Sequence, residues 1–102
     1  MKKHKVRWSR VAISDLRDSY DWGVEYWGQE KAVDWLTEIE DTAIARLSQM
    51  PKAFPVAQES VEFAQEVRQM KFGRYRILFH LNGSEILILR IRGPFSGKSK
   101  PQ

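Results

Sequence analysis

Two amphipathic stripes separated by a single glycine constrain the fold of this sequence more than any other feature. Apolar residues recur at helical spacing over 13–27 and again over 32–50, with Gly28 between them. The first stripe is Ile13, Leu16, Tyr20, Val24 and Trp27, and the second is Ala32, Leu36, Ile39, Ala43, Leu47 and Met50. Ser9 stands where a helix N-cap belongs, and Pro51 stops the second helix. Because the connection at Gly28 is very short, residues 10–50 are predicted to form an antiparallel helical hairpin.

Four strands are predicted around this hairpin. Lys3–Trp8 alternates between basic and apolar residues, which is the pattern of a half-buried strand. Three later segments are rich in Ile, Leu, Phe, Tyr and Arg and are separated by Gly73 and Asn82-Gly83: 66–72, 74–81 and 85–92. Residues 51–60 contain two prolines and are predicted to be a connecting loop. The expected fold is α+β in the order β-α-α-β-β-β, with the helical hairpin packed on one face of a small, mainly antiparallel four-stranded sheet.

Length and composition limit the kind of protein. A chain of 102 residues fits one domain, and we expect residues 1–93 to form it, with 94–102 as an irregular basic tail. The net charge of +4 favours a polyanionic partner or an acidic protein segment. There is no cysteine and no apolar run long enough to cross a bilayer, so we expect a cytoplasmic protein with no membrane contact. Two distant histidines do not suggest a metal site, and no motif suggests a cofactor.

The parity of the last hairpin determines which side chains face the helices. A two-residue turn at Asn82-Gly83 would mix arginines with apolar residues on both faces of the sheet. A three-residue loop, Leu81-Asn82-Gly83, segregates them better, and we favour it. The predicted apolar face is then Tyr75, Ile77, Phe79, Leu87, Leu89 and Ile91. The predicted opposite face is Arg74, Arg76, Leu78, His80, Ile86, Ile88, Arg90 and Arg92, joined by Arg68, Met70 and Phe72.

Several motifs in this order resemble the RelE/ParE superfamily of type II toxin–antitoxin toxins. The opening of the first helix, Trp8-Ser9 with Asp15-Leu16, and the strand motif Gly73-Arg74-Tyr75-Arg76-Ile77 are similar to that superfamily. So are the Phe54-Pro55 loop, the strand Glu66–Met70 with its central arginine, and the last strand Ile86–Arg92. The likeness covers residues 5–93. It implies a toxin that is neutralised by a cognate antitoxin, which we expect to be acidic with an amphipathic segment.

The resemblance implies one of two activities and leaves a third reading open. RelE-type members cleave messenger RNA on the ribosome, and this is the activity we favour from the sequence: a metal-independent endoribonuclease (mRNA interferase). ParE-type members inhibit DNA gyrase without known nuclease chemistry. The chain departs from both patterns after Arg92, where its tail lacks a tyrosine. An inactivated member that only binds its antitoxin is the third reading.

Candidate site residues follow from the arginine-bearing sheet face. Cleavage of RNA needs stabilisation of charge at phosphate, and Arg76 is the first candidate, followed by Arg68. An ion pair with a nearby Glu or Asp is the structural alternative for both. Substrate-binding candidates are Arg74, Arg90, Arg92, Lys98 and Lys100. No metal ligand is predicted.

Overall fold

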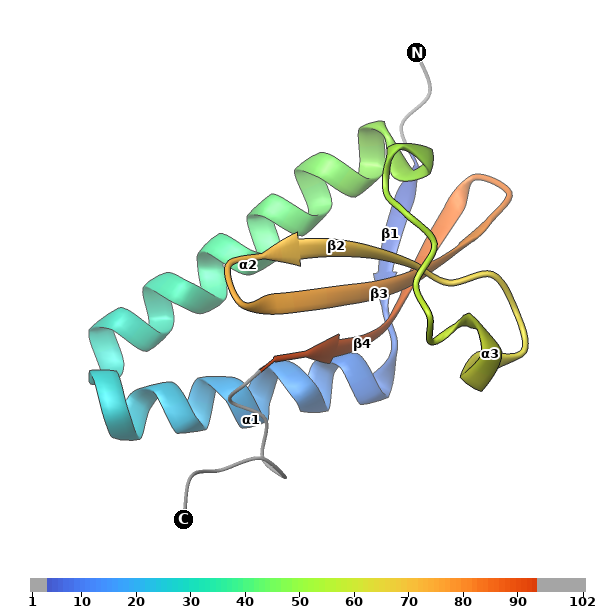
Figure 1. Cartoon of the computed structure of the whole chain (residues 1–102). Coiled ribbons are helices and arrows are strands. Elements are labelled where there is room, and N and C mark those ends of the chain that lie inside the picture. Colours follow the sequence, from blue (N-terminus) through green and yellow to red (C-terminus); the bar gives the residue numbers. More distant parts are fainter. Residues whose placement is uncertain (1–3, 94–102) are drawn as a thin grey trace.

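The computed structural model describes residues 4–93 of the chain, and it contains four strands and three α-helices in that range. The order is β1 (Lys5–Trp8), α1 (Arg10–Trp27), α2 (Gln29–Gln49), the 3-10 turn η1 (Pro51–Ala53), α3 (Ser60–Phe63), β2 (Arg68–Phe72), β3 (Tyr75–Asn82) and β4 (Glu85–Arg92). The sheet order is β1-β4-β3-β2, with β1 parallel to β4 and the other neighbours antiparallel. Figure 1 shows α1 and α2 as a hairpin beside this sheet. The predicted fold class is confirmed.

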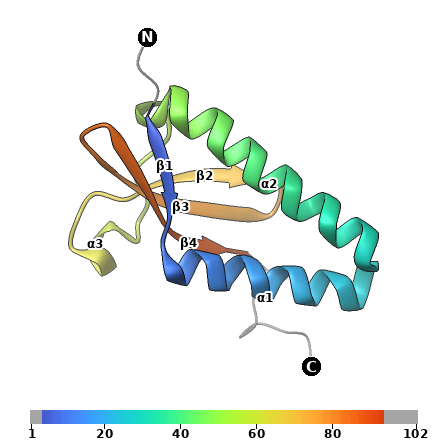
Figure 2. The same ribbon diagram turned by 180° about the vertical axis from the view of Figure 1, so that it is seen from behind.

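The caps of the helical hairpin lie where the sequence places them. The Ser9 hydroxyl accepts a hydrogen bond from the Ala12 amide at 3.0 Å and donates one to the Leu89 carbonyl at 3.0 Å, which ties the start of α1 to β4. Gly28 ends α1 with φ 97°, a conformation that favours glycine. Because one residue joins the two helices, the chain reverses direction and both helices cover one face of the sheet. Figure 2 shows α1 and α2 in front of the sheet, spreading apart from the end at which Gly28 joins them.

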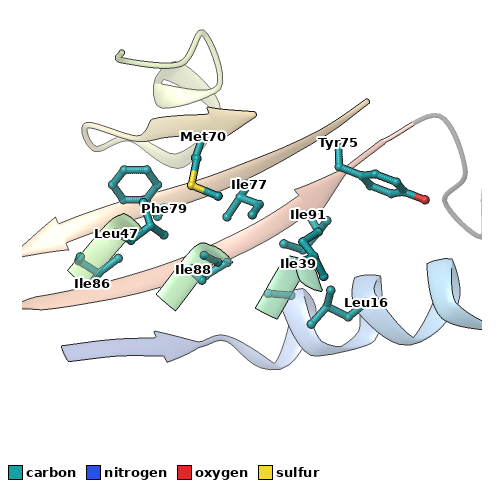
Figure 3. Close-up of a cluster of buried hydrophobic side chains, with 12 residues drawn as sticks. Leu16, Ile39, Leu47, Met70, Tyr75, Ile77, Phe79, Ile86, Ile88 and Ile91 are labelled. Atoms are coloured by element: carbon teal, nitrogen blue, oxygen red, sulfur yellow. The ribbon is translucent and has the colours of Figure 1, made fainter. Parts of the chain in front are cut away.

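One core lies between the helical hairpin and the sheet. Ile39 and Leu47 of α2 are fully buried against Phe79 of β3 and against Ile86 and Ile88 of β4. Figure 3 shows these side chains converging from both layers, with Tyr75 at the end of the cluster. The burial of these apolar side chains away from water is the main contribution that holds the helical layer on the sheet. None of the helices in residues 4–93 is long and apolar enough to span a membrane.

The predicted parity of the last hairpin is wrong near the turn. Asn82 pairs with Glu85, so the loop is two residues long, and the register shifts by one between Leu78 and Phe79. Beyond this β-bulge, Ile77 pairs with Ile91, so these two residues share one face of the sheet, as predicted, although in a different register. Ile86 and Ile88 therefore lie in the core and not on the arginine face, whereas Leu89 packs with Leu78, Ala57 and Val67 on the opposite face. A bulge thus reconciles a tight turn with segregated faces, a solution that neither uniform register offers.

Two further segments differ from expectation. Met70 and Phe72 pair with Ile77 and Tyr75 on the helix-facing side, so they do not join the arginine face, and Arg68 shares their parity. Residues 51–60 are not a featureless loop, because they include the turn η1 and the start of α3. The Ser60 hydroxyl accepts from the Val67 amide at 2.9 Å and donates to its carbonyl at 3.1 Å. These hydrogen bonds tie the start of α3 to the residue that precedes β2.

Candidate functional site

Three cations lie side by side across three neighbouring strands at one end of the sheet. Lys71 of β2 pairs directly with Arg76 of β3, and Arg76 pairs directly with Arg92 of β4. We call these three residues the cationic row. Like charges on directly opposed strand residues destabilise a sheet, so nearby anions or a ligand must offset this repulsion. Arg74, in the β2–β3 turn, adds a fourth cation at the same end.

A hollow of about 560 Å³ lies at this end of the sheet. Its principal lining residues are Lys71, Arg74, Tyr75, Arg76, Arg92 and Gly93. A Cβ added at Gly93 would lie 2.3 Å from Cδ2 of Tyr75, so only glycine fits there without displacing the ring. Burial raises the pKa of the Tyr75 phenol, and a hydrogen bond with Ser19 acts in the opposite direction. Tyr75 therefore forms a neutral apolar wall beside four cationic side chains.

Arg76 is bound by a carboxylate and an amide. Its guanidinium donates to both carboxylate oxygens of Glu59, with 3.1 Å between Nη1 and Oε1, and Nη1 also donates to Oε1 of Gln69 at 2.7 Å. Glu59 is 6% exposed. The hydrogen bond from Arg76 holds the pKa of Glu59 below its usual value, and the same bond raises the pKa of Arg76. The geometry is that of the structural ion pair named above as the alternative for Arg76.

Arg68 and Arg90 lie away from the cationic row. Nη1 of Arg68 donates to the Phe54 carbonyl at 2.7 Å, and Nη2 of Arg68 lies 3.6 Å from a Glu66 carboxylate oxygen. Arg90 forms a two-pronged pair with Asp15 of α1 at 2.9 and 3.1 Å, and Asp15 also accepts from the Ile91 amide. The bond to Asp15 raises the pKa of Arg90. Both arginines therefore tie segments of the fold together.

Arg92 and Arg74 line the hollow together with Lys71. Nη2 of Arg92 donates to Glu62 of α3 at 2.9 Å, and this carboxylate is 54% exposed. Of the predicted site residues, the structure thus brings together Arg74, Arg76 and Arg92. Lys98 and Lys100 lie outside the described residues.

Lys71, Glu59 and Glu62 are functional candidates that the sequence analysis missed. The alternation of side chains along a strand could have indicated Lys71, because the residue that follows a core-facing Met70 lies on the opposite face of the sheet. Glu59 and Glu62 carried no signal of their own, since their partners are 17 and 30 residues away in the sequence.

Comparison with known proteins identifies the family. The model of the family described as the ParE toxin of the type II toxin–antitoxin system parDE matches residues 6–93. Among solved structures, a chain of the chromosomal ParDE system from P. aeruginosa is 28% identical, with a TM-score of 0.74 over 89% of this chain and 96% of that chain. A chain of the toxin–antitoxin complex RelBE2 from Mycobacterium tuberculosis is 19% identical and shares the fold, with a TM-score of 0.66 over 91% and 93% of the two chains. No curated protein matches significantly.

These matches confirm the resemblance that the sequence motifs indicated. The family model covers nearly all of the part of the chain that the structure describes. Both similar structures come from toxin–antitoxin systems. The chain belongs to the ParE toxin family of type II toxin–antitoxin systems.

Proposed function

We propose that this toxin acts in the cytoplasm by binding and inhibiting DNA gyrase, as the resemblance to ParE-type members implies, and that it does not cleave messenger RNA. The observation that carries the proposal is the state of Arg76. A residue that stabilises a reacting phosphate needs guanidinium donors and positive charge available for it, whereas three of the five N–H donors of Arg76 are engaged by Glu59 and Gln69, and the Glu59 carboxylate offsets its charge. Arg68, the second catalytic candidate, donates to the Phe54 carbonyl.

Tyr75 and His80 are poorly placed to act as a general acid or base at the cationic row. General acid–base catalysis needs a group with a pKa near neutrality within reach of the reacting atoms. Burial raises the pKa of Tyr75, and the Tyr75 side chain is almost fully buried. His80 lies four residues beyond Arg76 along β3, where its Nδ1 is 2.9 Å from the Glu66 carbonyl oxygen. These placements favour inhibition by binding over catalysis.

One observation favours messenger RNA cleavage as a second candidate function. The cationic row and Arg74 concentrate positive charge around one hollow, as a site for an RNA phosphate requires. In that case Arg92 and Lys71 would have to supply most of the charge stabilisation, because Arg76 is paired with Glu59. A separate assay for this activity is therefore needed.

Two parallel titrations with purified full-length toxin test the proposal. Gyrase is assayed for supercoiling of relaxed plasmid, and translating ribosomes are assayed for new message ends, each over the same range of toxin concentration. We expect supercoiling to fall while messages stay intact, and the cognate antitoxin to reverse the effect. Normal supercoiling at excess toxin with cut messages would select the RNA-cleaving function. If the toxin changes neither supercoiling nor messages, the chain is an inactivated member that only binds its antitoxin.

The family supports a cognate antitoxin as the partner, and the distribution of charge supports a proposal for the side on which it docks. Residues 10–49 carry nine acidic and four basic residues, whereas residues 50–93 carry four acidic and seven basic ones. The helical layer is therefore acidic and the sheet layer is basic. An acidic antitoxin segment would be complementary to the sheet layer, and we propose that it docks on that side.

A further inference from the structure

The cationic row is only partly neutralised by the chain itself. Four cations line the hollow, and two carboxylates, Glu59 and Glu62, reach them. Lys71 and Arg74 are exposed and have no ion pair within residues 4–93. The hollow therefore keeps an excess of about two positive charges at its open side, where an external anion can reach them.

The two carboxylates differ in how firmly they hold their arginines. Glu59 is buried and holds both Nη atoms of Arg76, so an external anion would have to break a desolvated pair to displace it. Glu62 is 54% exposed and holds only Nη2 of Arg92. Within the described residues, Nε of Arg92 is buried and has no hydrogen-bond partner. Arg92 is thus the arginine of the row that can exchange its internal partner for a ligand.

We propose that this hollow binds the phosphodiester backbone of DNA, with Lys71, Arg74 and Arg92 in direct contact and Arg76 as a positioning residue. The inference rests on the proposed function, because gyrase holds DNA and an inhibitor bound to it would meet that backbone. Neighbouring strands lie about 4.8 Å apart, so three strands place three cations over roughly 10 Å. Duplex DNA carries one negative charge per roughly 1.7 Å of axis, a far denser array than a peptide offers. The row matches an extended polyanion better than a single carboxylate.

The test measures binding of the toxin alone to a fluorescently labelled 20-base-pair DNA duplex by anisotropy over a series of salt concentrations. The double variant Lys71→Gln/Arg74→Gln removes the two unpaired cations. Its control, Lys5→Gln/Arg7→Gln, removes two exposed cations from β1 at the opposite edge of the sheet and gives the same net charge; Arg7 lies 3.6 Å from an exposed Glu85 carboxylate oxygen. Each lost phosphate contact makes the slope of log K against log salt shallower by about 0.9. The slope for Lys71→Gln/Arg74→Gln should therefore be shallower by about 1.8, and this variant should bind the duplex roughly tenfold or more weakly at low salt. The control should stay within about twofold of the natural protein.

Glu62→Gln provides a test in the opposite direction. Freeing Arg92 and removing a nearby negative charge should tighten DNA binding by about twofold or more. Equal losses in the two double variants, or no change with Glu62→Gln, would overturn the assignment of the hollow. Binding of polyglutamate but not of duplex would also overturn it, in favour of an acidic protein segment.

A single-stranded RNA of the same sequence separates the two sources of phosphodiester. Comparable or weaker RNA binding supports DNA as the ligand, whereas a tenfold preference for RNA would overturn DNA and favour the RNA-cleaving function. These titrations contain no gyrase, so they test DNA binding independently of the proposed inhibition of gyrase. If supercoiling is unaffected by the toxin while duplex still binds at the hollow, only the gyrase proposal fails.

Discussion

Exchanging Glu59 for glutamine removes the charge that holds Arg76 while keeping the shape of the side chain. The natural pair has two hydrogen bonds, one partner 6% exposed and the other 30% exposed. Breaking a fully buried pair costs about 3–5 kcal/mol, and the partial exposure of Arg76 and its remaining bond to Gln69 reduce this. We expect a loss of about 2 kcal/mol in the free energy of unfolding.

Urea unfolding at pH 7 measures this loss, and thermal unfolding should show a midpoint about 10 °C lower. A double-mutant cycle with Arg76→Gln isolates the pair from the effects of each residue alone. The coupling energy should be about 1–2 kcal/mol, because the two side chains bind each other directly. A coupling energy near zero, with Glu59→Gln as stable as the natural protein, would refute a structural role for Arg76 and return it to the catalytic candidates.

Three further predictions concern the fold. Ile88→Ala should cost about 2–5 kcal/mol in urea unfolding, whereas Leu89→Ala, on the opposite face, should cost about half as much or less; the reverse order would contradict the β-bulge. Because the hydrogen bond from Arg76 lowers the folded pKa of Glu59, the contribution of this pair to stability is complete above the unfolded pKa and is lost as pH falls through the folded pKa, so acid should destabilise the natural protein more steeply than Glu59→Gln. Parallel curves of unfolding free energy against pH for the two proteins would contradict this contribution of Glu59. Ser9→Ala should cost about 1 kcal/mol, and an unchanged midpoint would mean that the cap contributes nothing.

Local patterns predict most of this fold, because they are sufficient to define each element. The helical stripes, Gly28 and Ser9 determine a hairpin from neighbouring residues alone, and strand composition gives the sheet. The bulge at Leu89 is not predicted, because the separation of apolar from charged residues favours one uniform register over another and does not indicate a shift within the hairpin. The local pattern of η1 and α3 was also missed, since the prolines of 51–60 suggested a loop.

The site was less predictable because its charges are set by long-range contacts. The sequence places Arg74, Arg76 and Arg92 on one face, and the structure brings them together. It does not reveal that Glu59 comes back over the sheet to bind Arg76, nor that Asp15 binds Arg90 across 75 residues. Whether an arginine is available to a ligand depends on these partners and not on its own strand position.

The most direct test of the account follows the fate of DNA and messages in the same cells after the toxin is induced without its antitoxin. Plasmid topology is read on chloroquine gels, and message ends are mapped from the same cultures. If gyrase is the target, plasmid supercoiling should fall before growth stops, with messages intact, and Arg76→Lys should retain the effect to the extent that it remains folded. New message ends with unchanged plasmid topology, abolished by Arg76→Lys in a folded protein, would contradict the account.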